Sequence, residues 1–103
     1  MNGLEKLIGK KVIVRCNAAG VFYGILSEFD AENKIAKIES CRRIWYWDGA
    51  ASLSQLSKDG VTNKQSSKFS VAVDEIIVCG VIEIIPCTTK AIDNIESVPT
   101  WRR

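Results

Sequence analysis

Histidine is absent from this sequence of 103 residues. Its absence removes the most common general base, the most common activator of nucleophiles and a frequent zinc ligand. No Gly-x-Ser-x-Gly elbow occurs. Residues 3–11 match a phosphate-binding loop only superficially, because they have one residue too many between the glycines and lack the Ser or Thr that holds magnesium. We therefore predict a binding protein rather than an enzyme, with no cofactor.

The four cysteines also lack the spacing of a metal or redox site, since no Cys-x-x-Cys pair occurs. Each lies in an apolar or strand-like run, where a free cysteine behaves as a small hydrophobic residue. We expect reduced cysteines in or near the core of a cytosolic protein, and no metal. The four are Cys16, Cys41, Cys79 and Cys87.

Long apolar runs are missing as well. The N-terminal residues 1–11 are interrupted by charged side chains, and no segment is long enough to cross a bilayer. We expect a cytoplasmic protein without a membrane partner. The net charge of +2 is too small to predict nucleic-acid binding from composition alone.

Hydrophobic residues make up 47% and charged residues 25% of the chain, the balance of one ordinary globular domain over residues 1–103. Alternating and β-branched runs predict about five strands, and helical spacing predicts a short inserted helix and a C-terminal helix. We expect a mainly β, α+β fold: a small, strongly bent antiparallel sheet or an SH3- or Sm-like barrel. The expected strands are 11–16, 21–29, 35–47, 69–73 and 76–86. The expected helices are 49–58 and a last helix that Thr88 or Thr89 caps and that ends near Ser97.

Local features refine this prediction. Gly24 lies inside the second strand and predicts a bend or a close backbone approach. The third strand is long for a single strand, which indicates a bulge within residues 40–42 or two strands. Residues 98–103 are expected to form an exposed, flexible tail, from which Trp101 can dock.

Residues 42–47, Arg-Arg-Ile-Trp-Tyr-Trp, concentrate the binding chemistry of the chain. Aromatic rings stack on bases, and arginine binds phosphate through two hydrogen bonds. Asp48 is the expected N-cap of the next helix, whose first N–H groups would also attract an anion. The candidate ligand-binding residues are Arg42, Arg43, Trp45, Tyr46, Trp47, Asp48, Ser52, Ser54, Tyr23 and Lys68.

The alternative is that these aromatic residues form a core cluster, with an arginine stacked on a tryptophan. Both interpretations can hold, because successive strand residues face opposite ways. We expect Arg43, Trp45 and Trp47 to be functional and Ile44 and Tyr46 to lean towards the core. A bulge would exchange these roles.

Two resemblances add expectations. Residues 20–30, Gly-Val-Phe-Tyr-Gly-Ile-Leu-Ser-Glu-Phe-Asp, resemble the first motif of the Sm-like fold, in which a strand is bent at a glycine. That resemblance implies a bent barrel and a tendency to form homo-oligomers. Residues 43–56 resemble a family of short, uncharacterised proteins carried by bacteriophages and prophages. This second resemblance implies that the protein acts in the cytoplasm of an infected bacterium.

Three functions are compatible with these features. The leading hypothesis is an anti-defence protein of the phage type that sequesters an anionic, nucleotide-derived immune signal without catalysis. One alternative is a protein-interaction module that inhibits a host enzyme, since Trp, Tyr and Arg dominate such interfaces. The other is a single-stranded nucleic-acid binder of the Sm type.

Overall fold

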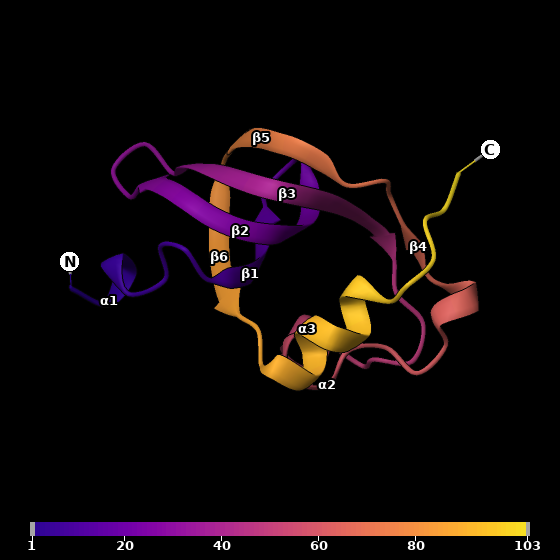
Figure 1. Cartoon of the computed structure of the whole chain (residues 1–103). Helices are drawn as coiled ribbons and strands as arrows, with labels where there is room; N and C mark the ends of the chain where they lie inside the picture. The colour runs from indigo at the N-terminus through magenta and orange to yellow at the C-terminus, as the bar shows by residue number, and fades with distance from the viewer. Residues whose placement is uncertain (1, 103) are drawn as a thin grey trace.

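The computed structural model describes residues 2–102 and has the predicted mostly β architecture (Figure 1). Six strands form one antiparallel sheet in the order β4-β3-β2-β1-β6, and β5 pairs with the other part of the β3 edge. The chain order is α1 (Asn2–Glu5), β1 (Lys11–Cys16), β2 (Gly20–Asp30), β3 (Ile35–Tyr46), α2 (Leu53–Asp59), the 3₁₀ turn η1 (Lys64–Ser66), β4 (Lys68–Phe69), β5 (Val73–Cys79), β6 (Val81–Pro86) and α3 (Thr89–Glu96).

The bent sheet is buried on both faces. Along β1, Val12 and Val14 belong to a first core inside the bend, whereas Ile13 belongs to a second core. The second core includes Leu56 of α2 and Ile95 of α3. Helices α2 and α3 lie together on one side of the sheet in Figure 1. Because the two cores share the strands between them, a side chain is placed in one or the other by strand alternation.

The predicted bend occurs at Gly24. A methyl group added there would lie 2.6 Å from Cγ2 of Ile38 and 2.7 Å from the carbonyl oxygen of Glu39. Opposite Gly24 the register shifts: Tyr23 pairs with Arg42 and Ile25 with Glu39, so β3 carries an extra residue. The bulge includes Ser40, whose φ of 48° is positive. The close backbone approach at Gly24 and the bulge at residues 40–42, both predicted from the sequence, are confirmed.

The helix expected at 49–58 begins later than predicted. The N-cap of α2 is Ser52, whose Oγ accepts a hydrogen bond from the N–H of Gln55 at 3.1 Å. Asp48 is therefore not the cap, because Ser52 together with Gln55 provides a better capping sequence. By contrast, α3 begins as predicted, with Thr88 as its N-cap. Among residues 2–102, no helix has both the length and the apolar character to cross a membrane.

The C-terminal segment is more firmly attached than predicted. Val98 is buried at 3% exposure, and Thr100 forms a parallel bridge with Phe69 of β4. The N–H of Trp101 donates to the carbonyl oxygen of Phe69 at 2.9 Å. Val98 is thus not part of an exposed tail, whereas Trp101 docks beside β4 through its backbone and its side chain stays 41% exposed.

We expect Gly24→Ala to lower the free energy of unfolding by at least about 3 kcal/mol, since an added methyl in a tight core typically costs about 1–3 kcal/mol and this one also meets a backbone oxygen. Gly20→Ala is the control. It adds a methyl where nothing lies within 4 Å, so only its left-handed backbone contributes, at about 1–2 kcal/mol. Chemical denaturation measures both. Equal losses would contradict the close approach at Gly24.

Candidate functional site

A second bulge divides residues 42–47 between core and surface. Ile44 pairs with Phe69, but Tyr46 pairs with Lys68, so Trp45 is the extra residue of β3. Ile44 and Phe69 point into the second core. Tyr46 is 49% exposed, against the expectation that it leans towards the core. The physical reason is the bulge, which reverses the alternation after Ile44.

The half-buried Arg43 and the exposed Trp45 form a cation–π pair. The Arg43 guanidinium carbon lies 4.9 Å from the ring centre of Phe22 and 5.7 Å from that of Trp45. The Trp45 side chain is 60% exposed. The backbone N–H of Arg43 donates to Oγ of Ser70 at 2.7 Å, which fixes this part of β3 beside the segment that follows β4. An exposed indole next to a fixed cation suits a base with an attached phosphate.

Tyr46, Lys68 and Trp101 form a second exposed group. Lys68 pairs with Tyr46 across the strands, and its Nζ lies 5.2 Å from the ring centre of Trp101. Trp101 is 41% exposed. Sequence reasoning predicted that Trp101 can dock but did not count it among the ligand-binding residues. Its only sequence signal is an isolated aromatic residue beside basic residues near the C-terminus.

These two groups lie on the same face of the sheet. Ile44 and Phe69 point into the second core. Arg43 directly precedes Ile44 and Lys68 directly precedes Phe69, so both point to the opposite face of the sheet. Pairing brings Tyr46 to Lys68 on that face. We call the set the aromatic–basic stripe. Its members are Arg43, Trp45, Tyr46, Lys68 and Trp101, and it contains two cations and no carboxylate.

Arg42, although next to Arg43, is buried at 7% exposure. Its Nε donates to the carbonyl oxygen of Ser70 at 2.9 Å, and its two terminal nitrogens donate to those of Ile95 at 2.9 Å and Val98 at 3.0 Å. Burial lowers its pKa. A cation at the C-terminal end of α3 also complements the helix dipole. The structure therefore places Arg42 in a structural network and not in the stripe.

Tyr23 is also separated from the stripe, because it is only 2% exposed. Its hydroxyl donates to Oε2 of Glu96 at 2.8 Å, and Nζ of Lys11 contacts the same oxygen at 2.6 Å. Burial and the bond to Glu96 raise the pKa of Tyr23 far above its ordinary value. Partial burial opposes ionisation of Glu96, but the bonds from Lys11 and Tyr23 outweigh it and lower the pKa of Glu96. Tyr23 thus joins β2 to α3.

The remaining predicted residues lie in the chain between β3 and α2 or in α2 itself. Trp47 is half-buried against the second core. The backbone of Asp48 is held by Ser67 and Asn63. Ser52 caps α2, and Ser54 is exposed on that helix of seven residues. No recorded contact within residues 2–102 brings these four side chains to the stripe.

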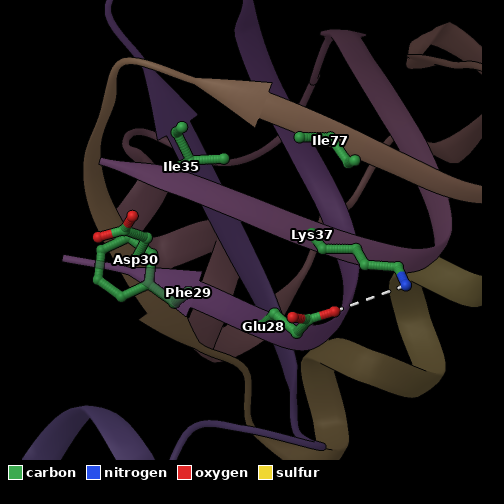
Figure 2. A pocket seen from close by; sticks show the side chains of 6 residues that line it. All are labelled: Glu28, Phe29, Asp30, Ile35, Lys37 and Ile77. Atoms are coloured by element: carbon green, nitrogen blue, oxygen red, sulfur yellow. Dashed lines mark ion pairs between the residues drawn. The ribbon is translucent and has the colours of Figure 1, made fainter. Parts of the chain in front are cut away.

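A shallow pocket of about 240 Å³ lies at the other end of β3, next to Ile77 of β5 (Figure 2). Its charged residues are Glu28, Asp30 and Lys37. Nζ of Lys37 is 3.5 Å from Glu75 and 3.6 Å from Glu28, and these carboxylates, Glu75 above all, raise the pKa of Lys37. With its lysine already paired and carboxylates in excess, this pocket is a poor site for an anionic ligand.

A larger groove of about 450 Å³ lies between α2, α3 and the loop after α2. It contains Lys64 and Lys90, but Nζ of Lys90 is 3.5 Å from Asp59. No aromatic residue lines it, so it offers no surface for stacking a base. Over the described residues 2–102 there is no group of three or more His, Cys, Asp or Glu residues able to hold a metal ion.

The architecture defines a class: a small, mostly β protein with a strongly bent antiparallel sheet of the Sm-like kind. Residues 9–95 match the family model "Domain of unknown function (DUF6948)", and the chain belongs to that family.

A heptameric archaeal Sm protein of known crystal structure is similar to this chain, with 22% sequence identity and a TM-score of 0.55. The match covers 85% of this chain and all of the archaeal one. At this identity the similarity shows the fold, and it confirms the Sm-like shape predicted from residues 20–30. No curated protein matches the chain.

We expect Arg42→Met to lower the free energy of unfolding by about 3 kcal/mol, because it leaves the carbonyl oxygens of Ser70 and Val98 without a donor and each unsatisfied buried group costs about 1–3 kcal/mol. Arg43→Met is the matched control, with an expected loss of about 1 kcal/mol from its cation–π contacts, because this half-buried side chain has no carbonyl partner that the change would leave unsatisfied. Thermal and chemical unfolding measure both variants. If Arg43→Met is the more damaging change, the division of roles between the two arginines is wrong.

Proposed function

We propose that this protein binds an anionic, nucleotide-derived ligand on the aromatic–basic stripe and sequesters it without catalysis. The observation that carries the proposal is the placement of the Arg43 guanidinium beside Trp45, whose side chain is 60% exposed. One residue pair thereby offers a stacking surface for a base and a fork of donors for a phosphate.

Charge supports an anionic ligand. Arg43 and Lys68 contribute two positive charges to the stripe, and no ion pair is recorded for either side chain among the residues described. The more deeply buried Arg42 is excluded from this role by its three carbonyl partners. Binding requires neither histidine nor a metal, so sequestration agrees with the chemistry that the sequence offers.

The biological setting is part of the proposal and rests on resemblance. Residues 43–56 resemble short proteins of phages and prophages, where a nucleotide-binding protein can remove an immune signal from the bacterial cytoplasm.

The second candidate ligand is a single-stranded nucleic acid. It is favoured by the openness of the stripe, which runs along β3 and across β4, and by the Sm-like fold. A polynucleotide would bind with strong salt dependence, because its backbone releases counterions.

We also propose that the protein forms a homo-oligomer through the outer edges of β5 and β6. Each of these strands has one partner strand recorded in residues 2–102, β3 for β5 and β1 for β6. Ile77 on β5 is 64% exposed and Ile82 on β6 is 48% exposed. Unpaired edges that carry apolar side chains are ready to pair with another chain. The similar archaeal protein is a heptamer.

Calorimetry with cyclic nucleotides and ADP-ribose derivatives tests the proposed ligand class. We expect at least one to bind with recovered ligand unchanged, and we expect Trp45→Ala to weaken it at least tenfold, since stacking on an aromatic residue contributes about 1–3 kcal/mol per base. Val71→Ser is the control, because Val71 is exposed but lies outside the stripe.

Three results would contradict the first candidate. They are no binding of any nucleotide, steady breakdown of the ligand, or equal affinity of the Trp45→Ala variant. Binding of oligonucleotides alone, with affinity that falls steeply between low and high salt, would instead support the second candidate.

Light scattering tests the oligomer. We expect a mass that is a multiple of the chain mass of 11.4 kDa. The double variant Ile77→Asp/Ile82→Asp should shift it to a monomer, since burying unpaired carboxylates in an apolar contact is unfavourable. Ser54→Asp adds a similar charge on the exposed side of α2, outside β5 and β6, and should leave the mass unchanged. A wild-type monomer at every concentration would exclude this assembly.

A further inference from the structure

We propose that Tyr46, Lys68 and Trp101 form a site for two bases joined by one phosphodiester. One base stacks on each ring, and the phosphate lies on the lysine between them. This inference rests on the proposed nucleotide-binding function and specifies its ligand. It also assigns a binding role to Trp101, in the C-terminal segment.

The three side chains come from three neighbouring segments of backbone. Tyr46 of β3 is paired with Lys68 of β4. On the other edge of β4, Phe69 forms a parallel bridge with Thr100 and accepts a hydrogen bond from the N–H of Trp101 at 2.9 Å. Neighbouring strands lie about 4.8 Å apart, so the backbones that carry the two rings lie roughly 10 Å apart, with the backbone of Lys68 between them.

The lysine is positioned for an anion. Its Nζ lies 5.2 Å from the ring centre of Trp101, and no carboxylate within residues 2–102 is recorded as its ion-pair partner. Contact with the ring restricts the side chain while leaving the positive charge uncompensated. A phosphate can therefore approach Lys68 without displacing another anion.

The second ring is the feature that indicates two bases. A single ring and one cation are sufficient for a mononucleotide, and Trp45 with Arg43 already provides them. Tyr46, 49% exposed, and Trp101, 41% exposed, lie on opposite sides of one cation. A ligand that uses both rings must carry two bases flanking a phosphate. A cyclic dinucleotide and a stretch of single-stranded nucleic acid both meet this requirement.

Binding of AMP, linear ApA, cyclic di-AMP and their guanine counterparts to the full-length protein tests the proposal. We expect the two-base ligands to bind at least tenfold more tightly than the mononucleotides. Trp101→Ala and Tyr46→Ala should each remove most of that gain, and Lys68→Met should weaken the two-base ligands at least fivefold. A preference for the cyclic over the linear form, or for a ten-residue oligonucleotide over both, identifies the source of the two bases.

The controls separate this proposal from the broader one. Trp101→Phe should retain most of the gain, because a smaller ring still stacks, and Val71→Ser should have wild-type affinity. All variants should keep the wild-type unfolding temperature. The two-base site is excluded if two-base ligands gain nothing over mononucleotides, or if Trp101→Ala binds them within twofold of wild type. In that case mononucleotide binding that depends on Trp45 would leave the broader function intact, whereas no binding of any ligand would reject both.

Discussion

The buried guanidinium of Arg42 is the interaction on which the arrangement of the stripe depends. Its three donors reach the carbonyl oxygens of Ser70, Ile95 and Val98. Ser70 follows β4, which carries Lys68, and Val98 precedes the segment that carries Trp101. One side chain of β3 thus holds both neighbouring segments against its own strand. The energetic cost of burying this charge is offset because Arg42 satisfies the carbonyl oxygens of Ser70 and Val98 and adds a donor to that of Ile95, which also accepts from the N–H of Val98 at 3.2 Å.

Two bulges in β3 then determine which side chains face solvent. Because of the bulge opposite Gly24, Cys41 packs in the first core, whereas the side chains of Arg42 and Ile44 face the second core. The bulge at Trp45 exposes Tyr46 beside Lys68. Without the second bulge, Tyr46 would follow Ile44 into the second core. Alternation along this strand gives the adjacent arginines different surroundings: Arg42 is buried in the hydrogen-bond network, and Arg43 is half-buried beside the exposed Trp45.

Much of the fold follows from local sequence patterns, which explains why it was predictable. The period-2 run at residues 11–16 and the Thr88 cap with its apolar spacing carry their own structural signals, and both elements form where predicted. The bend at Gly24 is equally local, since only glycine permits the close approach of Ile38 and Glu39.

The candidate site was less predictable because its parts are distant in sequence. The bulge at Trp45 is defined by pairing with β4, a strand of only two residues more than 20 positions away, and no local pattern marks that partner. The burial of Arg42 depends on the last turn of α3 and on Val98, over 50 residues along the chain. For the same reason Tyr23, which sequence alone assigned to the ligand, lies in the second core, and its hydroxyl donates to the exposed Glu96.

The two parts of β3 belong to different surfaces. Its first part, residues 35–41, pairs with β5, whose outer edge is proposed for assembly. Its last part pairs with β4 and carries Arg43, Trp45 and Tyr46 of the stripe. Assembly and ligand binding can therefore use different parts of the same edge of β3, through β5 and β4, without competing for the same side chains. An oligomer built through β5 and β6 would leave the β4 end of each chain exposed and present one stripe per chain, so repetition of a modest site would increase the amount of ligand that one assembly removes from solution.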